Sequence, residues 1–180
     1  MSDERQREAD MELWLSKLKE GEISIGMENV GEVPIILKKN EKIELLLPNI
    51  TLLEPRRVTT GGYGGPTVRV AKGLYFRVGA FRAQSHEEIK EVDRGLLVLT
   101  NKRLVFLGDK RTSSIDLRKI VAVEPYRDGI SVASERRKHP QYFIGVDQME
   151  LNVTVGERSY VEPLTGLILM YLIEGLAKKT

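Results

Sequence analysis

Apolar and polar positions form their clearest pattern between Gly95 and Gly108, which reads GLLVLTNKRLVFLG. Two apolar runs, Leu96–Leu99 and Leu104–Leu107, are separated by the polar segment Thr100–Arg103. Val, Leu and Phe suit a pleated, half-buried surface, and Asn favours a turn, so the pattern predicts a tight β-hairpin. Both faces of such a hairpin would be apolar. One face should therefore line a core, and the other should be covered by another part of the chain or by a second chain.

The segments on both sides of this hairpin carry further strand patterns. After the hairpin, apolar residues recur through 113–123, and Asp128-Gly129 marks another turn. Lys42–Leu53 is expected to form a strand pair or one bent strand. Further strands are expected at Thr67–Phe76 and Gln141–Val146, with Met149–Val155 less regular. Short strands joined by tight turns predict an antiparallel barrel or sandwich of about seven strands.

Two segments show helical patterns. Four apolar residues fall on one face of an amphipathic helix over residues 2–19: Met11, Trp14, Leu15 and Leu18. A C-terminal helix is expected to begin near Pro163, and its apolar residues run almost all the way round. A helix that caps a sheet needs one apolar stripe, so another element must cover the second side. The pattern divides the chain into an N-terminal helix with connector, residues 1–34, and a β domain with a C-terminal helix, residues 35–180.

Composition describes an ordinary globular chain. Of 180 residues, 41% are hydrophobic and 30% are charged, which is typical of soluble proteins. The 28 basic residues are interleaved with the 26 acidic residues and give a formal charge of +2, which disfavours a nucleic-acid partner. The lack of cysteine fits a reducing cytoplasm. No secretory leader is expected from the first residues, and no apolar run approaches the ~20 residues that span a bilayer.

The sequence shows no recognisable catalytic or metal-binding pattern. His86 and His139 are the only histidines, and no carboxylate lies at a ligand-like spacing from either. The glycine-rich segment Thr60–Pro66 leads into a strand, whereas a phosphate loop opens a helix. We therefore expect no enzyme activity, no metal and no cofactor. Four carboxylates before the main hairpin are expected to form a solvated surface: Glu87, Glu88, Glu91 and Asp93.

The segments 93–108, DRGLLVLTNKRLVFLG, and 113–132, SSIDLRKIVAVEPYRDGISV, resemble the pleckstrin-homology-like superfamily. They are similar to GRAM-like and bacterial pleckstrin-homology-like domains, which carry a G-x-L-x-L-T-N-x-R-L-I-F-x-G hairpin, an I-x-L-x-x-I strand and a Y-x-D-G-I turn. The close match covers about forty residues. It implies a barrel or sandwich of about seven strands capped by a C-terminal helix. Relatives bind phosphoinositides, bind proteins or assemble into rings, so the resemblance leaves the ligand open.

Eight residues are candidate ligand contacts. In lipid-binding relatives, a Lys/Arg-rich pattern lines the loop between the first two strands, and the spacing in this chain is longer. A second candidate group is the one dense basic run, which is expected at a hairpin tip. The candidates are Arg56, Arg57, Tyr63, Arg69 and Lys72 around the glycine-rich loop, and Arg136, Arg137 and Lys138 in the basic run.

Two functions follow from these patterns. The first is a cytoplasmic, non-enzymatic binding or assembly module that contacts a protein partner or further copies of itself. It rests on the two apolar helices, which together would expose more apolar surface than a small monomer usually does. The helices could instead pack on each other within one chain. The alternative function is peripheral binding to an anionic membrane, through lipid or phosphoinositide head groups that contact the basic candidates.

Overall fold

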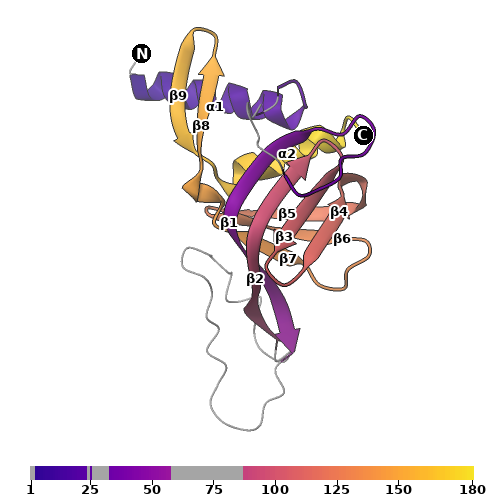
Figure 1. The fold of residues 1–180 in the computed structure, drawn as a ribbon. Helices are drawn as coiled ribbons and strands as arrows, with labels where there is room; N and C mark the ends of the chain where they lie inside the picture. Colours follow the sequence, from indigo (N-terminus) through magenta and orange to yellow (C-terminus); the bar gives the residue numbers. More distant parts are fainter. Residues whose placement is uncertain (1–2, 24, 26–32, 58–86) are drawn as a thin grey trace, which may run out of the picture.

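The protein is mainly β, with one helix near each end of the chain, as predicted (Figure 1). The computed structural model describes residues 3–23, 25, 33–57 and 87–180. Seven antiparallel strands form one sheet in the order β4-β3-β2-β1-β7-β6-β5, and two more form a separate hairpin. The strands of the sheet are β1 (Ile43–Arg57), β2 (Glu87–Thr100), β3 (Arg103–Gly108), β4 (Thr112–Asp116), β5 (Ile120–Tyr126), β6 (Gly129–Ser134) and β7 (Gln141–Ile144). The remaining elements are α1 (Asp3–Lys19), η2 (Leu117–Lys119), η3 (Val146–Gln148), β8 (Glu150–Val155), β9 (Arg158–Pro163) and α2 (Gly166–Ala177).

The predicted hairpin is the pair β2–β3, and its inner face forms the centre of the core. Leu97 pairs with Phe106, and Leu99 pairs with Leu104. All four side chains are at most 1% exposed. The Phe106 ring lies 5.9 Å from the ring of Phe143 on β7, between centroids. The hairpin therefore joins the two halves of the sheet through one core, and the prediction that one face of the hairpin lines a core is confirmed.

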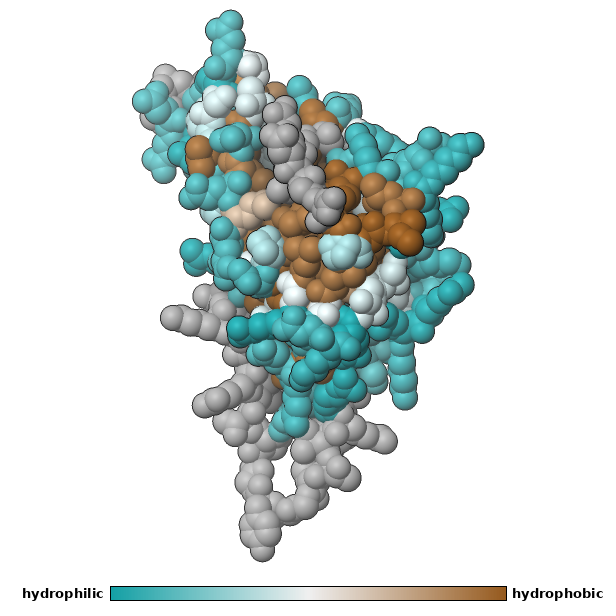
Figure 2. All heavy atoms as spheres, in the orientation of Figure 1, coloured by the Kyte–Doolittle hydropathy of each residue, from teal (hydrophilic) through white to brown (hydrophobic). Residues whose placement is uncertain are grey.

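The outer face of strands β1–β3 carries a second set of apolar side chains. In register, Leu46 pairs with Val98, Val98 with Val105, and Leu96 with Leu107. Val98 and Val105 are buried, whereas the three leucines are half-buried. Figure 2 shows apolar atoms gathered over these strands, with charged residues around them. We call these five residues the outer apolar patch.

The turn between β3 and β4 is held by a buried carboxylate. Asp93 accepts hydrogen bonds from the backbone N–H groups of Arg94, Lys110 and Arg111. Burial opposes ionisation, but these three donors outweigh it, so the pKa of Asp93 is lowered. A Cβ at Gly108 would lie 1.9 Å from the Asp93 carboxylate, so this position requires glycine. The expectation that Asp93 lies on a solvated surface is wrong, because the carboxylate is buried against the turn.

The two helices pack on each other and close one side of the sheet (Figure 1). Trp14 and Leu18 of α1 are buried, and α2 also contacts β5 and β6. A Cβ at Gly175 would lie 2.2 Å from the Leu18 carbonyl oxygen, so glycine permits this close approach. Most of the apolar surface of α2 is thus covered within the same chain, although Leu167 is 39% exposed.

The start of α2 differs from the sequence prediction. Pro163 ends β9, and the helix begins at Gly166. The Thr165 hydroxyl accepts a hydrogen bond from the Ile168 N–H at 3.3 Å and caps the helix. Proline suits a first helical turn, but the side-chain cap two residues later determines where this helix begins.

The hairpin β8–β9 is attached to α1 by charged groups. Arg158 on β9 donates to the Asp10 carboxylate at 2.6 and 2.8 Å, and the Tyr160 hydroxyl also donates to Asp10. Arg7 pairs with Glu162 further along the same strand. These contacts orient a two-stranded sheet that has no strand partner in the larger sheet.

Candidate functional site

The loop before β1 is built around Glu41. The buried Glu41 carboxylate accepts from Arg103 Nε at 2.9 Å, from Thr100 Oγ1 at 2.7 Å and from the Lys38 N–H at 2.9 Å. Burial opposes ionisation, but these donors outweigh it, so the pKa of Glu41 is lowered. The Arg103 guanidinium, from the polar end of the predicted turn, is thus paired with a buried carboxylate.

The turn between β2 and β3 fixes the rest of this loop. Asn101 accepts from the Lys42 N–H at 2.8 Å and donates to the Asn40 carbonyl at 3.0 Å. Lys102 Nζ donates to the Lys39 carbonyl at 2.7 Å. The T-N-K-R sequence that marks this turn therefore binds the segment that leads into β1. This long-range role could not be deduced from the turn pattern alone.

A basic cleft of about 620 Å³ lies between this loop, the β2–β3 turn and the end of α2. Five basic side chains line it: Lys38, Lys42, Lys102, Arg118 and Lys179. Only two acidic side chains do so, and both are paired. Glu44 lies 3.4 Å from Lys42 Nζ, and Asp116 lies 3.2 Å from Arg118. The hydrogen bonds from Arg118 lower the pKa of Asp116. The cleft can therefore attract an anion.

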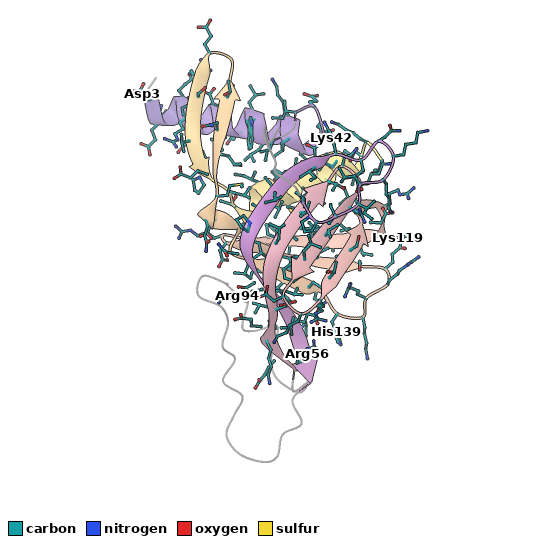
Figure 3. The ribbon with its side chains drawn as sticks, in the orientation of Figure 1. Asp3, Lys42, Arg56, Arg94, Lys119 and His139 are labelled. Carbon is teal, nitrogen blue, oxygen red and sulfur yellow. The ribbon has the colours of Figure 1, made fainter. Side chains whose placement is uncertain are left out.

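A second cleft, of about 500 Å³, adjoins the first and shares Lys38 and Asp116 with it. It adds basic side chains from the β4–β5 connection and the β6–β7 loop, namely Lys119, Arg136 and Arg137. Among the described residues, five basic side chains of these clefts have no ion-pair partner: Lys38, Lys102, Lys179, Arg136 and Arg137. We call the two clefts together the basic face. In Figure 3, Lys42 and Lys119 mark two of its edges.

The net positive charge of the basic face is larger than the net charge of the whole chain. Eight basic and two acidic side chains line the two clefts. The whole chain carries a formal charge of only +2, so the remaining residues are net acidic. Composition did not reveal this separation, because the cations come from five segments that are interleaved with acidic residues along the sequence.

The structure places the predicted contact residues in different surroundings. Arg136 and Arg137 line the basic face, whereas Lys138 is exposed in the same loop and lines neither cleft. Arg56 pairs with Glu54 at 3.1 Å, and it lies at the opposite end of β1 from Lys42 (Figure 3). The side chains of the other predicted contacts lie outside the part of the chain that the structure describes. Arg57 pairs by backbone with β2, and Tyr63, Arg69 and Lys72 lie outside the described residues.

Six basic residues of the site were missed in the sequence: Lys38, Lys42, Lys102, Arg118, Lys119 and Lys179. The segment PIILKKNEK contained one usable signal, because two adjacent lysines follow an apolar run just before a strand. The others lie in short basic pairs at turns or at the end of α2, where charged residues are common: Lys102-Arg103, Arg118-Lys119 and Lys178-Lys179. Only the antiparallel topology brings these turns together.

A third cleft, of about 760 Å³, is acidic instead. Asp109, Asp128 and Asp147 line it, together with Arg94. Asp128 is buried, and its Oδ1 atom has no hydrogen-bond partner among the described residues. Burial and the nearby Asp147 raise the pKa of Asp128. Across the described ranges, no three histidine or carboxylate side chains converge as a metal site would require.

Comparison with known proteins finds no matching family model and no matching curated protein. Neither described helix is long and apolar enough to cross a membrane. The basic face is therefore the main structural evidence on function.

Proposed function

We propose that this protein is a non-enzymatic binding module that docks on anionic membrane surfaces through its basic face. The observation that carries the proposal is the convergence of eight basic and two acidic side chains on two adjoining clefts. Lipid phosphates and other anionic head groups attract such clusters electrostatically. The sequence resemblance to pleckstrin-homology-like domains supports the same reading, since some of those domains bind phosphoinositides.

The number of cations that contact the membrane determines the affinity of such binding. Each basic residue near an anionic surface contributes about 1 kcal/mol. The five cations without an ion-pair partner would together provide ~5 kcal/mol, which corresponds to a Kd of about 0.2 mM. All eight would provide ~8 kcal/mol, close to micromolar affinity. We therefore expect the whole face to act together, and we expect binding to weaken as salt screens the charges.

Self-association has less structural support than membrane docking. It was suggested by the apolar surface of α2, and that surface packs against α1, β5 and β6 within one chain. Association of copies, or contact with another protein, stays a prediction. Light scattering on the purified protein tests the first of these, and a monomer at micromolar concentration would contradict it.

Co-sedimentation with lipid vesicles tests the proposal. The variant Lys38→Glu/Arg136→Glu reverses two charges that line the second cleft, one from the loop before β1 and one from the β6–β7 loop. The matched control Lys110→Glu/Arg127→Glu makes the same change in net charge at exposed residues that line neither basic cleft. We expect the first variant to bind phosphatidylserine-containing vesicles at least about ten-fold more weakly than the control. Equal loss in both variants, or equal binding to neutral vesicles, would overturn the proposal.

A further inference from the structure

Ile36 is the most exposed large apolar side chain of the described residues, at 91%, and its neighbour Leu37 is 42% exposed. A single exposed apolar residue is ordinary on a protein surface. This pair is less ordinary, because it directly precedes Lys38, which lines both clefts of the basic face. Lys39 follows and is exposed as well. Two apolar side chains and two cations are thus presented together.

The loop that carries this pair is fixed in position. Arg103 Nη2 donates to the Ile36 carbonyl oxygen at 2.8 Å, and Nη2 and Nε both donate to the Glu41 carboxylate. The Lys38 N–H and the Lys39 carbonyl are bound as well. Because the backbone is held on both sides of Leu37, the exposed side chains are displayed before any ligand arrives. Such preorganisation reduces the entropy lost on binding.

The same loop lies beside further apolar surface. Arg103 extends from the outer face of β3, where the neighbouring residue Val105 belongs to the outer apolar patch. The loop therefore crosses the face on which Figure 2 shows the apolar atoms gathered. Apolar and basic surfaces meet along this loop, which matches the layering of a bilayer, with charged head groups above hydrocarbon.

We propose that Ile36 and Leu37 insert into the hydrocarbon layer of an anionic bilayer while the basic face contacts the head groups. This inference rests on the proposed function, since the cations must first bring the loop to the surface. Burial of apolar side chains is independent of ionic strength, so the inserted pair should supply a part of the binding that salt does not remove. Ile36→Ser should weaken binding to phosphatidylserine-containing vesicles about ten-fold.

Fluorescent labelling tests insertion directly. The chain contains no cysteine, so a single cysteine at Ile36→Cys can carry a polarity-sensitive nitrobenzoxadiazole label. The control is Val161→Cys on β9, which is 57% exposed and lines neither basic cleft. With phosphatidylserine-containing vesicles, the label at position 36 should shift to the blue and be quenched by lipids spin-labelled on their acyl chains. The label at position 161 should do neither.

Two negative results have different meanings. If the unlabelled and labelled proteins co-sediment with anionic vesicles but the label at position 36 stays in water, insertion is wrong and the proposed function stands. If the unlabelled protein does not bind anionic vesicles, the proposed function fails and the insertion fails with it. A blue shift of equal size at positions 36 and 161 would also contradict the inference, because it would indicate unspecific adsorption.

Discussion

Phe106 is the single residue on which the core depends most clearly. Its side chain is fully buried on β3 and contacts the Phe143 ring across the sheet. Removing a large buried aromatic side chain costs transfer free energy and leaves a cavity. We expect Phe106→Ala to lower the free energy of unfolding by about 3–5 kcal/mol, measured by chemical denaturation. The control Val121→Ala, at an exposed position, should change it by less than about 0.5 kcal/mol. A Phe106→Ala protein that melts with the parent would contradict the assignment of the core.

At the same scale, individual residues show what the sequence could and could not predict. The two apolar runs in Leu96–Leu107 predicted a hairpin with one face in the core, because strand pattern and hydrophobicity are local properties of the sequence. The roles of Asp93 and Arg103 were not predicted, because each depends on partners that lie on other segments. When the partner of a charged residue in a strand is not known, the residue is expected to face solvent.

The element scale shows the same contrast. β8 lies within Met149–Val155, the less regular of the expected strands, whereas β9 carries two charges and a half-buried tyrosine and gave no strand pattern. Its position depends on α1, through Asp10. The basic face was missed for the same physical reason, since its cations reach one surface through the turns of the sheet. Arg136 and Arg137 could be predicted as candidates because they are adjacent in the sequence and belong to one dense basic run.

Asp10 makes the attachment of β8–β9 sensitive to acid. Hydrogen bonds from Arg158, and then from Tyr160, hold the pKa of Asp10 well below its ordinary value. A lowered carboxyl pKa contributes stability that is present above the ordinary pKa of about 4 and is lost as the pH falls towards the lowered pKa. We expect Asp10→Asn to be less stable at neutral pH and to lose less stability down to about pH 3. Unfolding measured across this range checks the prediction, with the exposed Glu8→Gln as control. Parallel stability curves for Asp10→Asn and the parent protein would contradict it.

Gly175 tests whether α1 packs on α2 in solution. Alanine normally stabilises a helix by about 0.5–1 kcal/mol relative to glycine. Here its Cβ would meet the Leu18 carbonyl oxygen at 2.2 Å, and such crowding costs about 1–3 kcal/mol. We therefore expect Gly175→Ala to destabilise the protein in a thermal or chemical unfolding experiment. A stabilised variant would mean that the two helices separate, which would leave the apolar surface of α2 free for another partner.

At the scale of the whole molecule, the fold separates charges that the sequence interleaves. The turns β2–β3 and β4–β5, the loop β6–β7, the loop before β1 and the end of α2 all contribute cations to the basic face. Acidic residues line a separate cleft beside the β5–β6 turn. Such a charge distribution orients a protein on a charged surface even when its net charge is small.

The most direct test of this account is the binding of the unaltered protein to vesicles as a function of salt. The fraction bound is measured by co-sedimentation with phosphatidylcholine vesicles, with and without phosphatidylserine, at increasing sodium chloride concentration. We predict binding only to the phosphatidylserine-containing vesicles, strongest at low salt and falling steadily as the Debye length shortens. No binding at low salt, or equal binding to both kinds of vesicle at every salt concentration, would contradict the claim that the basic face is a membrane-docking surface.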